Sequence, residues 1–406
     1  MRSKTPCSFA LIYLLAVAIT AALSSVPALA KAQYKVLATI SGGLWSGLTL
    51  DSKGNLYGAT NAGGQYSHGS IYEVSPNANG TWTTTTIYSF NGTDGDNPAG
   101  GLVFDAVGNL YGVTFGGGAY DYGTVFELTP GVAGWSLTTL YSFCRQNDCA
   151  DGSTPDAGLA QDEDGNLYGT ANGGLYGLGV VFEMSPGLDG WTESVLYTFG
   201  SRTDDATESR APLALRGSRV YGTSESGGAH NAGSVFEVKK DAGGWKERVL
   251  HSFCPIPCKG GGGPKASVIL DASGDIYSTS EGGPSACDGA PCGTVFELTR
   301  DLNGRWIEQV LYDFSSPRKG FEPATGVVFD EAGNLYGTTA LGGAGMCFDG
   351  CGVVYKLTPT DRGKWKSTVL YEFMSSYDSP PDGQLVIDPK GNLYGTAVNI
   401  VYEVTP

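Results

Sequence analysis

Short apolar segments alternate with polar turns along the whole chain, and this pattern predicts β-strands rather than helices. The clearest marker is a tyrosine that follows Leu, Val or Ile and precedes Gly or Ser. It occurs at Tyr57, Tyr111, Tyr168, Tyr221, Tyr277, Tyr336 and Tyr394, at intervals of 53 to 59 residues. The chain therefore contains seven units of one repeat.

Each unit contains four apolar runs of strand length. In the second unit they lie at residues 101–105, 109–112, 125–128 and 135–143, separated by Asp, Gly, Asn and Pro, which favour turns. The fourth run begins with Trp and ends with Phe eight residues later. Six units show this spacing: Trp82–Phe90, Trp135–Phe143, Trp191–Phe199, Trp245–Phe253, Trp306–Phe314 and Trp365–Phe373. Unit four replaces its first turn with residues 216–219, which predicts a tighter two-residue hairpin.

The seventh unit lacks a fourth run, and the N-terminal segment supplies a replacement. Residues 34–40 read YKVLATI, in which Val36 and Leu37 align with the Val-Leu of other copies and Ile40 takes the place of Phe. Seven four-stranded sheets that cover each other's faces form a β-propeller, and a unit divided between the two termini closes the ring. The sequence therefore predicts an all-β, seven-bladed propeller of antiparallel blades, closed by a strand near Val36 that pairs beside Tyr402.

Residues that recur in every unit are expected to serve the scaffold, because a catalytic site is needed only once. A glutamate recurs in the third strand at Glu73, Glu127, Glu183, Glu237, Glu297 and Glu403, and Lys356 replaces it in unit six. We interpret these carboxylates as hydrogen-bond partners of neighbouring strands or loops.

The N-terminus has the composition of a secretory signal peptide. Arg2 and Lys4 precede an apolar run over 9–23, and an Ala-x-Ala sequence ends at Ala30. We expect residues 1–30 to be removed and residues 31–406 to form a single propeller domain, secreted to the periplasm or beyond the cell. The formal net charge of −16 argues against nucleic acid and membrane insertion, and we expect a monomer.

Eight cysteines of the mature chain form four close pairs, and an exported chain with an even number of cysteines favours disulfides. The pairs are Cys144/Cys149, Cys254/Cys258, Cys287/Cys292 and Cys347/Cys351. Zinc held by the two middle pairs, or a bridge between those two loops, is the alternative. We expect no cofactor; the oxygen-rich segment 91–97 leaves calcium as a minor possibility.

The strand order predicts one plain face and one elaborated face. The turns after the second strands and the links between blades are long, carry all eight cysteines, and lie on the elaborated face, where function is expected. Aromatic and polar residues on these loops are the candidate ligand-binding set: Trp45, Tyr66, His68, Tyr120, Asp121, Tyr122, Tyr176 and His230. Aromatic planes with polar neighbours suit sugar rings or peptide side chains; packing of the loops themselves is the competing interpretation.

No nucleophile elbow, phosphate-binding loop or dinucleotide fingerprint is present. The leading hypothesis is therefore a binding or interaction module for an extracellular carbohydrate or protein, acting through the disulfide-braced loop face. The alternative is an extracellular hydrolase or lyase that acts on a polysaccharide or lactone at an axial site, although the first strands are mostly apolar.

The combined motif GNLYGTT, Gly-Gly, a variable stretch and GTVFELTP resembles the GloVer-type tandem-repeat (choice-of-anchor) family of secreted bacterial proteins. Residues 333–359 and 108–130 show it clearly, and the likeness covers nearly all of the mature chain. The resemblance implies a propeller-type fold and no particular activity.

Overall fold

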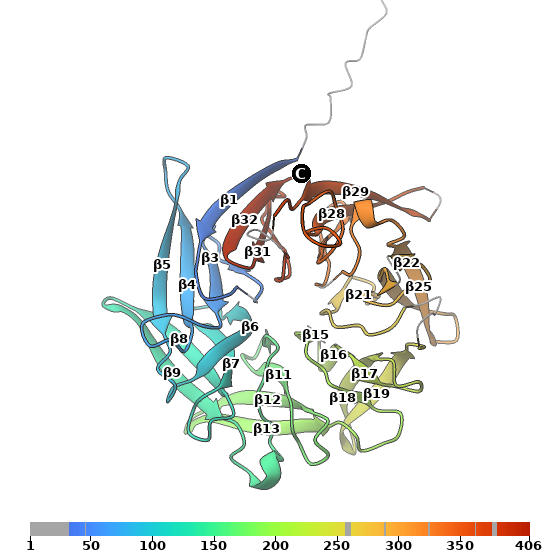
Figure 1. Ribbon diagram of the computed structural model, residues 1–406. Helices are drawn as coiled ribbons and strands as arrows, with labels where there is room; N and C mark the ends of the chain where they lie inside the picture. The colour runs from blue at the N-terminus through green and yellow to red at the C-terminus, as the bar shows by residue number, and fades with distance from the viewer. Residues whose placement is uncertain are drawn as a thin grey trace, which may run out of the picture. The chain divides into compact units, whose positions relative to one another are not determined.

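The computed structural model describes residues 32–44, 46–255, 261–287, 290–323, 325–361, 363–375 and 380–406. The expected signal peptide lies outside these residues. The described residues form seven four-stranded antiparallel sheets, each built from strands in the spatial order first to fourth. Figure 1 shows the seven sheets arranged around a central axis. The predicted seven-bladed propeller is confirmed.

The first four blades take residues 49–252. Blade 1 contains β2 (Thr49–Leu50), β3 (Leu56–Thr60), β4 (Ser70–Pro76) and β5 (Trp82–Ser89). Blade 2 contains β6 (Asp96–Phe104), β7 (Leu110–Gly116), β8 (Thr124–Gly131) and β9 (Gly134–Ser142). Blade 3 contains β10 (Ala160–Gln161), β11 (Leu167–Ala171), β12 (Val180–Gly187) and β13 (Gly190–Thr198). Blade 4 contains β15 (Ala214–Arg216), β16 (Arg219–Ser224), β18 (Ser234–Asp241) and β19 (Gly244–Ser252).

The last three blades complete the ring. Blade 5 contains β20 (Ile269–Leu270), β21 (Ile276–Ser280), β24 (Thr294–Arg300) and β25 (Trp306–Asp313). Blade 6 contains β26 (Val328–Phe329), β27 (Leu335–Thr339), β28 (Val353–Pro359) and β29 (Trp365–Glu372). Blade 7 contains β30 (Val386–Ile387), β31 (Leu393–Ala397), β32 (Ile400–Thr405) and β1 (Gln33–Thr39). Small additions in the loops are β14 (Ala206–Thr207) with β17 (Ser226–Gly227), β22 (Ala286–Cys287) with β23 (Ala290–Pro291), and the 3-10 turns η1 (Asn147–Cys149) and η2 (Pro317–Lys319).

The N-terminal strand closes the ring in the predicted register. β1 pairs antiparallel with β32, and Val36 lies opposite Tyr402. Tyr34 stacks on Tyr371 of the adjacent blade, with ring centroids 3.7 Å apart and an interplanar angle of 4°. Figure 1 shows β1 beside β32, at the junction where the first and last strands of the chain meet. Backbone pairing of the two ends therefore replaces the edge that an open array would expose.

The repeated Asp-x-x-Gly-Asn-Leu-Tyr sequence is explained by one hydrogen-bonded turn between the first and second strands. In blade 2, one oxygen of Asp105 accepts the backbone N–H groups of Val107 and Asn109, at 3.0 and 2.8 Å. The other oxygen accepts Asn109 Nδ2 at 2.8 Å and the Tyr111 hydroxyl at 3.1 Å. Burial raises the pKa of Asp105, but the bonds from Asn109 outweigh it and hold the pKa below its ordinary value. Blade 4 has the predicted tight hairpin instead, with Arg216 paired to Arg219.

The recurring third-strand glutamates belong to the same scaffold. The hydroxyls of Tyr111 and Tyr168 donate to Glu127 and Glu183 on the adjacent strand, at 3.1 and 2.8 Å. In blade 6, where lysine replaces glutamate, the Lys356 ammonium lies 5.2 Å from the Tyr336 ring centroid. A role in packing the strands, repeated from blade to blade, explains why this position recurs.

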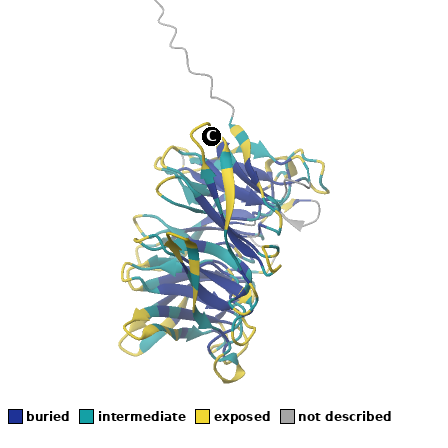
Figure 2. Ribbon diagram, turned by 90° about the vertical axis from the view of Figure 1, so that its left-hand side faces the viewer, coloured by how far each residue is buried: buried dark blue, intermediate teal, exposed yellow. Residues whose placement is uncertain are grey.

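Aromatic rings pack the blades against one another. In each of blades 1 to 6 the Phe that directly follows the fourth strand contacts the third-strand Phe or Tyr of the next blade, at centroid distances of 5.1 to 5.3 Å. The glycine after the repeat tyrosine makes room for this ring: a Cβ on Gly112 would lie 2.6 Å from the Phe126 ring. Ile40 takes the place of Phe beside Tyr72 at the closing junction. Figure 2 shows the resulting buried layer within the sheets, with exposed residues concentrated in the loops.

Three acidic side chains on the outermost strands are buried or half-buried. Burial raises the pKa of Glu193, Glu247 and Glu308 to about 7. Glu308 Oε2 lies 3.4 Å from Nε2 of His251, whose pKa burial lowers to about 4. Because the pKa values of these groups are shifted in the folded protein, the free energy of unfolding should depend on pH near neutrality.

Candidate functional site

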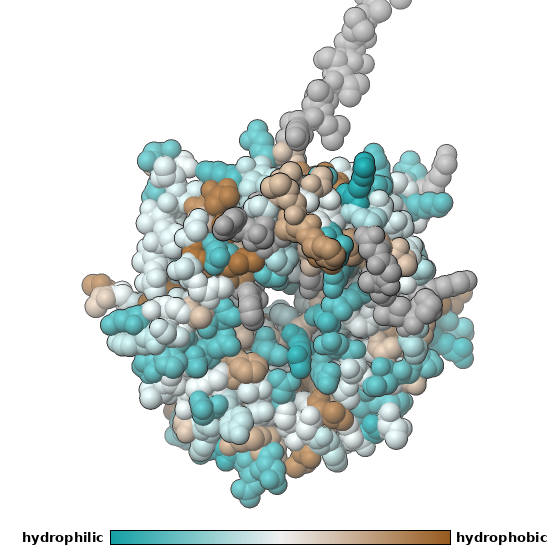
Figure 3. All heavy atoms as spheres, in the orientation of Figure 1, coloured by the Kyte–Doolittle hydropathy of each residue, from teal (hydrophilic) through white to brown (hydrophobic). Residues whose placement is uncertain are grey.

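The axis of the ring is a channel that opens at the centre of the face seen in Figure 3. The cavity measures about 680 Å³ and is lined by residues of the first strands and of the segments that lead into them. Half-buried apolar side chains contribute to its wall, among them Leu50, Val328, Val386 and Ile387. This volume falls within the range of small-molecule sites.

Charged residues line the channel at one position of the repeat. This position lies three residues before the Leu or Val, such as Leu159, that leads into the first strand of a blade. The described residues at that position are Ala99, Asp156, Arg210, Lys265 and Asp382. Four of the five are charged and line the cavity. These four charged residues belong to no motif within a single unit, so sequence motifs do not identify them. The sequence feature that could have identified them is the variation of this position from blade to blade, because other positions of the repeat are more uniform.

The charged residues of blades 3 and 4 form a loose pair. Arg210 Nε lies 3.7 Å from Asp156 Oδ2, and the arginine side chain is 54% exposed. Burial raises the pKa of Asp156 to about 6, against the opposing effect of Arg210. Among the described residues, the terminal nitrogens of Arg210 donate no hydrogen bond.

Lys265 in blade 5 is held more firmly. Its ammonium lies 3.0 Å from Glu281 Oε1 and 3.3 Å from Glu225 Oε1. Burial lowers the pKa of Lys265, but these two carboxylates outweigh it and raise the pKa above its ordinary value. Burial and Glu281 also raise the pKa of nearby Glu322. The positive charge of Lys265 is therefore already neutralised by the protein.

Blade 7 contributes the remaining acid and narrows the channel. Burial raises the pKa of Asp382 to about 6, and its carboxylate accepts no hydrogen bond from any residue that the structure describes. Nearby, Gln384 reaches past blade 6 to blade 5, where Ser267 Oγ bonds to its side-chain oxygen at 2.8 Å. Gly326 of blade 6 permits this crossing, because a Cβ there would lie 2.6 Å from Ser267 Oγ.

The predicted tyrosines are not among the residues that line the channel. Tyr66, Tyr120 and Tyr176 occupy the same position in the loops after the second strands of blades 1 to 3, and their exposed fractions are 51%, 46% and 56%. His230 occupies this position in blade 4 and is also exposed. The loops bond to the outermost strands, as in the bond from the N–H of Gln65 to Ser89 Oγ at 3.2 Å. We call these four side chains the aromatic arc.

The other described members of the predicted binding set lie in the same loops as the arc. His68 Nδ1 lies 3.1 Å from Asp96 Oδ1, beneath the blade 1 loop. Asp121 and Tyr122 are exposed in the blade 2 loop, and the Tyr122 carbonyl accepts the N–H of Thr154 at 2.7 Å. Trp45 lies outside the described residues. Binding by any of these residues stays a prediction.

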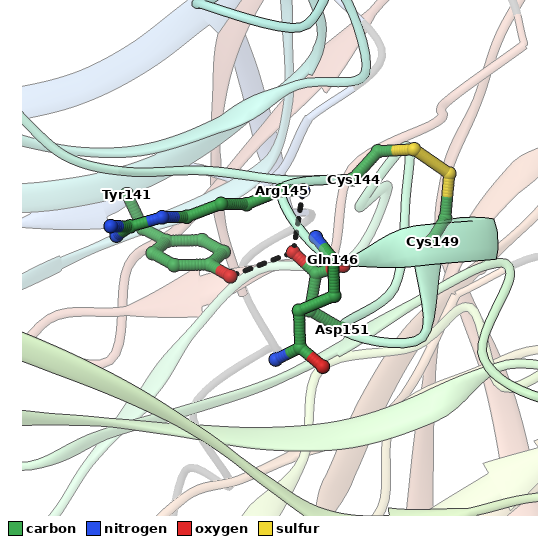
Figure 4. Close-up of a disulfide and its surroundings, with 6 residues drawn as sticks. All are labelled: Tyr141, Cys144, Arg145, Gln146, Cys149 and Asp151. Atoms are coloured by element: carbon green, nitrogen blue, oxygen red, sulfur yellow. Dashed lines mark hydrogen bonds between the residues drawn. A yellow bond between two sulfur atoms is a disulfide. The ribbon is translucent and has the colours of Figure 1, made fainter.

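The cysteine pairs brace the same face. Cys144 bonds to Cys149, Cys287 to Cys292 and Cys347 to Cys351. Cys254 is also disulfide-bonded, and Cys258 lies outside the described residues. In Figure 4 the Cys144–Cys149 loop closes over buried Asp151, which accepts the Tyr141 hydroxyl at 2.7 Å and the Arg145 N–H at 2.9 Å.

In the oxygen-rich segment 91–97, an aspartate also accepts hydrogen bonds from its own loop. Asp94 accepts the Tyr88 hydroxyl at 2.5 Å, and it accepts the backbone N–H of Asn91 at 2.9 Å and its Nδ2 at 2.8 Å. Both oxygens of Asp94 are thus engaged in holding the loop. Across the described ranges, no three His, Cys, Asp or Glu side chains are grouped so as to hold a metal ion.

The sequence matches the Gloeobacter/Verrucomicrobia repeat family over residues 29–236 and 212–402. The chain belongs to this family. The family resemblance noted from the GNLYGTT and GTVFELTP segments is therefore confirmed. No curated protein matches this Gloeobacter/Verrucomicrobia repeat protein.

Solved structures similar to this Gloeobacter/Verrucomicrobia repeat protein include two enzymes. An ancestral GH74 enzyme matches with a TM-score of 0.51 and 10% identity, covering 82% of this chain and 53% of the enzyme. This chain thus spans about half the length of that enzyme. A luciferin-regenerating enzyme matches with a TM-score of 0.41 and 13% identity, covering 92% of this chain and 95% of the enzyme. At these identities the likeness extends to the fold alone.

Within the described residues, no helix is long and apolar enough to cross a membrane.

Proposed function

We propose that this protein is an exported glycan-binding module and that the aromatic arc is its binding surface. The observation that carries the proposal is the repetition of a half-exposed tyrosine at one loop position in three consecutive blades, with a histidine in the fourth. Buried ring contacts elsewhere in the molecule serve packing. The arc residues present large ring surfaces to solvent, as a stacking platform requires.

The loops that carry the arc are fixed before any ligand binds. In each of blades 1 to 3 a glycine at the end of the loop donates to a glycine at its start, at 2.9 to 3.1 Å. Ser89 and Ser142 on the outermost strands hold the first two loops at a further point. Because the backbone is already ordered, little conformational entropy would be lost on binding.

The surroundings of the arc favour a neutral polysaccharide. A shallow pocket of about 390 Å³ beside Tyr66 is lined by polar groups that include Gln65, Thr86 and Asn91. Asp121 and Asn231 are exposed next to Tyr120 and His230. These groups can bond sugar hydroxyls while the rings stack on sugar C–H faces. The net charge of −16 disfavours an acidic polymer.

Export is part of the proposal. The three disulfides within the described residues suit an oxidising compartment, where such bonds persist. The protein would then meet its glycan outside the cytoplasm.

Titration calorimetry with soluble neutral glucans, xylans and mannans tests the proposal. Replacing Tyr66, Tyr120 or Tyr176 by alanine should weaken binding about tenfold each, a typical loss for a stacking ring. Val132→Ala and Leu188→Ala are matched controls, because both residues are fully exposed but lie in the third-to-fourth strand hairpins of the opposite face. Affinity that survives all three tyrosine substitutions would exclude the arc.

Catalysis in the axial channel is the second candidate. One observation favours it: Asp156 and Asp382 line a cavity, and burial raises the pKa of each to about 6, a value suited to proton transfer. Reducing-sugar release and lactone hydrolysis are the assays. A turnover that Asp156→Asn and Asp382→Asn both abolish, with the tyrosine variants unaffected, would favour the enzyme over the binding module.

A further inference from the structure

Two side chains of opposite charge in the axial channel, Arg210 and Asp382, have no close ion pair or side-chain hydrogen bond among the described residues. Arg210 has a single ion pair among the described residues, through Nε to Asp156 at 3.7 Å, and its two terminal nitrogens make no hydrogen bond. The Asp382 carboxylate has neither an ion pair nor a hydrogen bond in that same set. Lys265 differs, because two glutamates within 3.3 Å already compensate its charge.

These two groups face the cavity from opposite sides. Arg210 precedes the first strand of blade 4 and Asp382 precedes that of blade 7, three blades apart in a ring of seven (Figure 1). Both contribute to the lining of the same 680 Å³ cavity. The wall also includes the half-buried apolar residues Leu50, Val328 and Ile387.

The charge arrangement selects among ligand classes. A ligand with only a negative group would meet the repulsion of Asp382, and a ligand with only a positive group would meet that of Arg210. A neutral ligand would remove water from both charges without compensating either. A ligand with one charge of each sign at its two ends compensates both charges, and an aliphatic middle contacts the half-buried apolar side chains of the wall.

We infer that the axial channel is a second binding site, distinct from the aromatic arc, and that it takes a short apolar peptide with free ends. The peptide carboxylate bonds to the Arg210 guanidinium and its ammonium bonds to the Asp382 carboxylate. Leu50, Val328 and Ile387 of the wall accept small aliphatic side chains. The inference does not depend on glycan binding at the arc.

Titration calorimetry of the mature protein at about pH 7.5 tests the site. The probes are Ala-Ala, tri-alanine and tetra-alanine, each also in its N-acetylated and C-amidated forms. At least one free peptide should bind, and each cap should weaken that peptide about tenfold or more, because each cap removes one charge-assisted hydrogen bond. The peptide length that binds most tightly indicates the distance between the Arg210 guanidinium and the Asp382 carboxylate.

Substitutions of Arg210 and Asp382 test which residue binds which end of the peptide. Arg210→Gln should weaken the free peptide while leaving the affinity for its C-amidated form unchanged, and Asp382→Asn should do the same for the N-acetylated form. Arg248→Gln, on the exposed side of β19, is the matched control and should change nothing. Circular dichroism and the midpoint of thermal unfolding establish that each variant is folded.

Three results would overturn the inference: capped and free peptides that bind equally, free peptides that do not bind at about 10 mM, or binding that is indifferent to both substitutions. Substitutions in the aromatic arc should leave peptide affinity unchanged. Loss of glycan binding in those variants alone would therefore separate the two sites, and a failure of one proposal would leave the other standing.

Discussion

Replacing three buried tyrosines by phenylalanine should stabilise the propeller. Tyr72, Tyr355 and Tyr402 occupy the third-strand position that holds phenylalanine in blades 2 to 5, and all three side chains are fully buried. Their hydroxyls find no hydrogen-bond partner among the described residues. Burial raises the pKa of each phenol, which reflects the absence of water and of a stabilising donor.

The expected gain follows from two opposing contributions. A buried hydroxyl without a partner costs about 1–3 kcal/mol of folding free energy. Removing the oxygen leaves a void of roughly 10 Å³, which costs about 0.2 kcal/mol at 24 cal/mol per Å³. Each oxygen lies in the space beside the facing glycine of the preceding strand, where a Cβ on that glycine would lie 2.3 to 2.4 Å from it. We therefore expect each substitution to raise the free energy of unfolding by about 1–2 kcal/mol.

Equilibrium unfolding in guanidinium chloride measures the effect, with the midpoint concentration as the readout for single and triple variants. Phe126→Tyr and Phe182→Tyr make the reverse change in blades 2 and 3 and should destabilise by a similar amount. If the Tyr→Phe variants unfold at lower denaturant than the parent protein, the hydroxyls have partners and the reasoning fails.

Three further predictions test the scaffold. Gly112→Ala should destabilise the fold by at least about 2 kcal/mol, because the new Cβ would overlap the Phe126 ring. Gly101→Ala is the control and should be tolerated, because its Cβ would meet no atom within 4 Å. The midpoint of unfolding in guanidinium chloride measures both effects. Deleting residues 32–40 should lower the midpoint of thermal unfolding more than any single substitution here, because β32 loses its partner; an unchanged midpoint would refute ring closure as a source of stability. The free energy of unfolding should be higher at about pH 5.5 than at about pH 8. Buried glutamates with a folded-state pKa of about 7, against an ordinary 4.5, penalise the fold when ionised above pH 7, and the penalty fades as the pH falls toward 4.5. His251 acts in the opposite direction: burial lowers its pKa from 6.5 to about 4, so it reduces the free energy of unfolding as the pH falls below 6.5. A triple glutamate-to-glutamine variant should flatten the profile, and a profile that rises from pH 5.5 to 8 would contradict the assignment.

Local sequence predicted much of the fold because each blade repeats one set of short-range constraints. The Asp-x-x-Gly-Asn-Leu-Tyr turn needs only residues within six positions of Asp105. The Trp-to-Phe spacing sets the length of the fourth strand, and the displaced copy near Val36 predicted which two strands close the ring. The recurrence of Glu127 and its equivalents similarly predicted a scaffold role, which the bond from Tyr111 explains.

The candidate sites depended on the tertiary structure to a greater degree. Sequence alone identified the exposed tyrosines of the arc, but their separation from the channel follows from the way each loop bonds to its outermost strand. Arg210 and Asp382 are separated by more than 170 residues, and neither belongs to a motif. Only a closed ring brings the start of every first strand to one axis, so only the folded chain shows that these charges share a cavity.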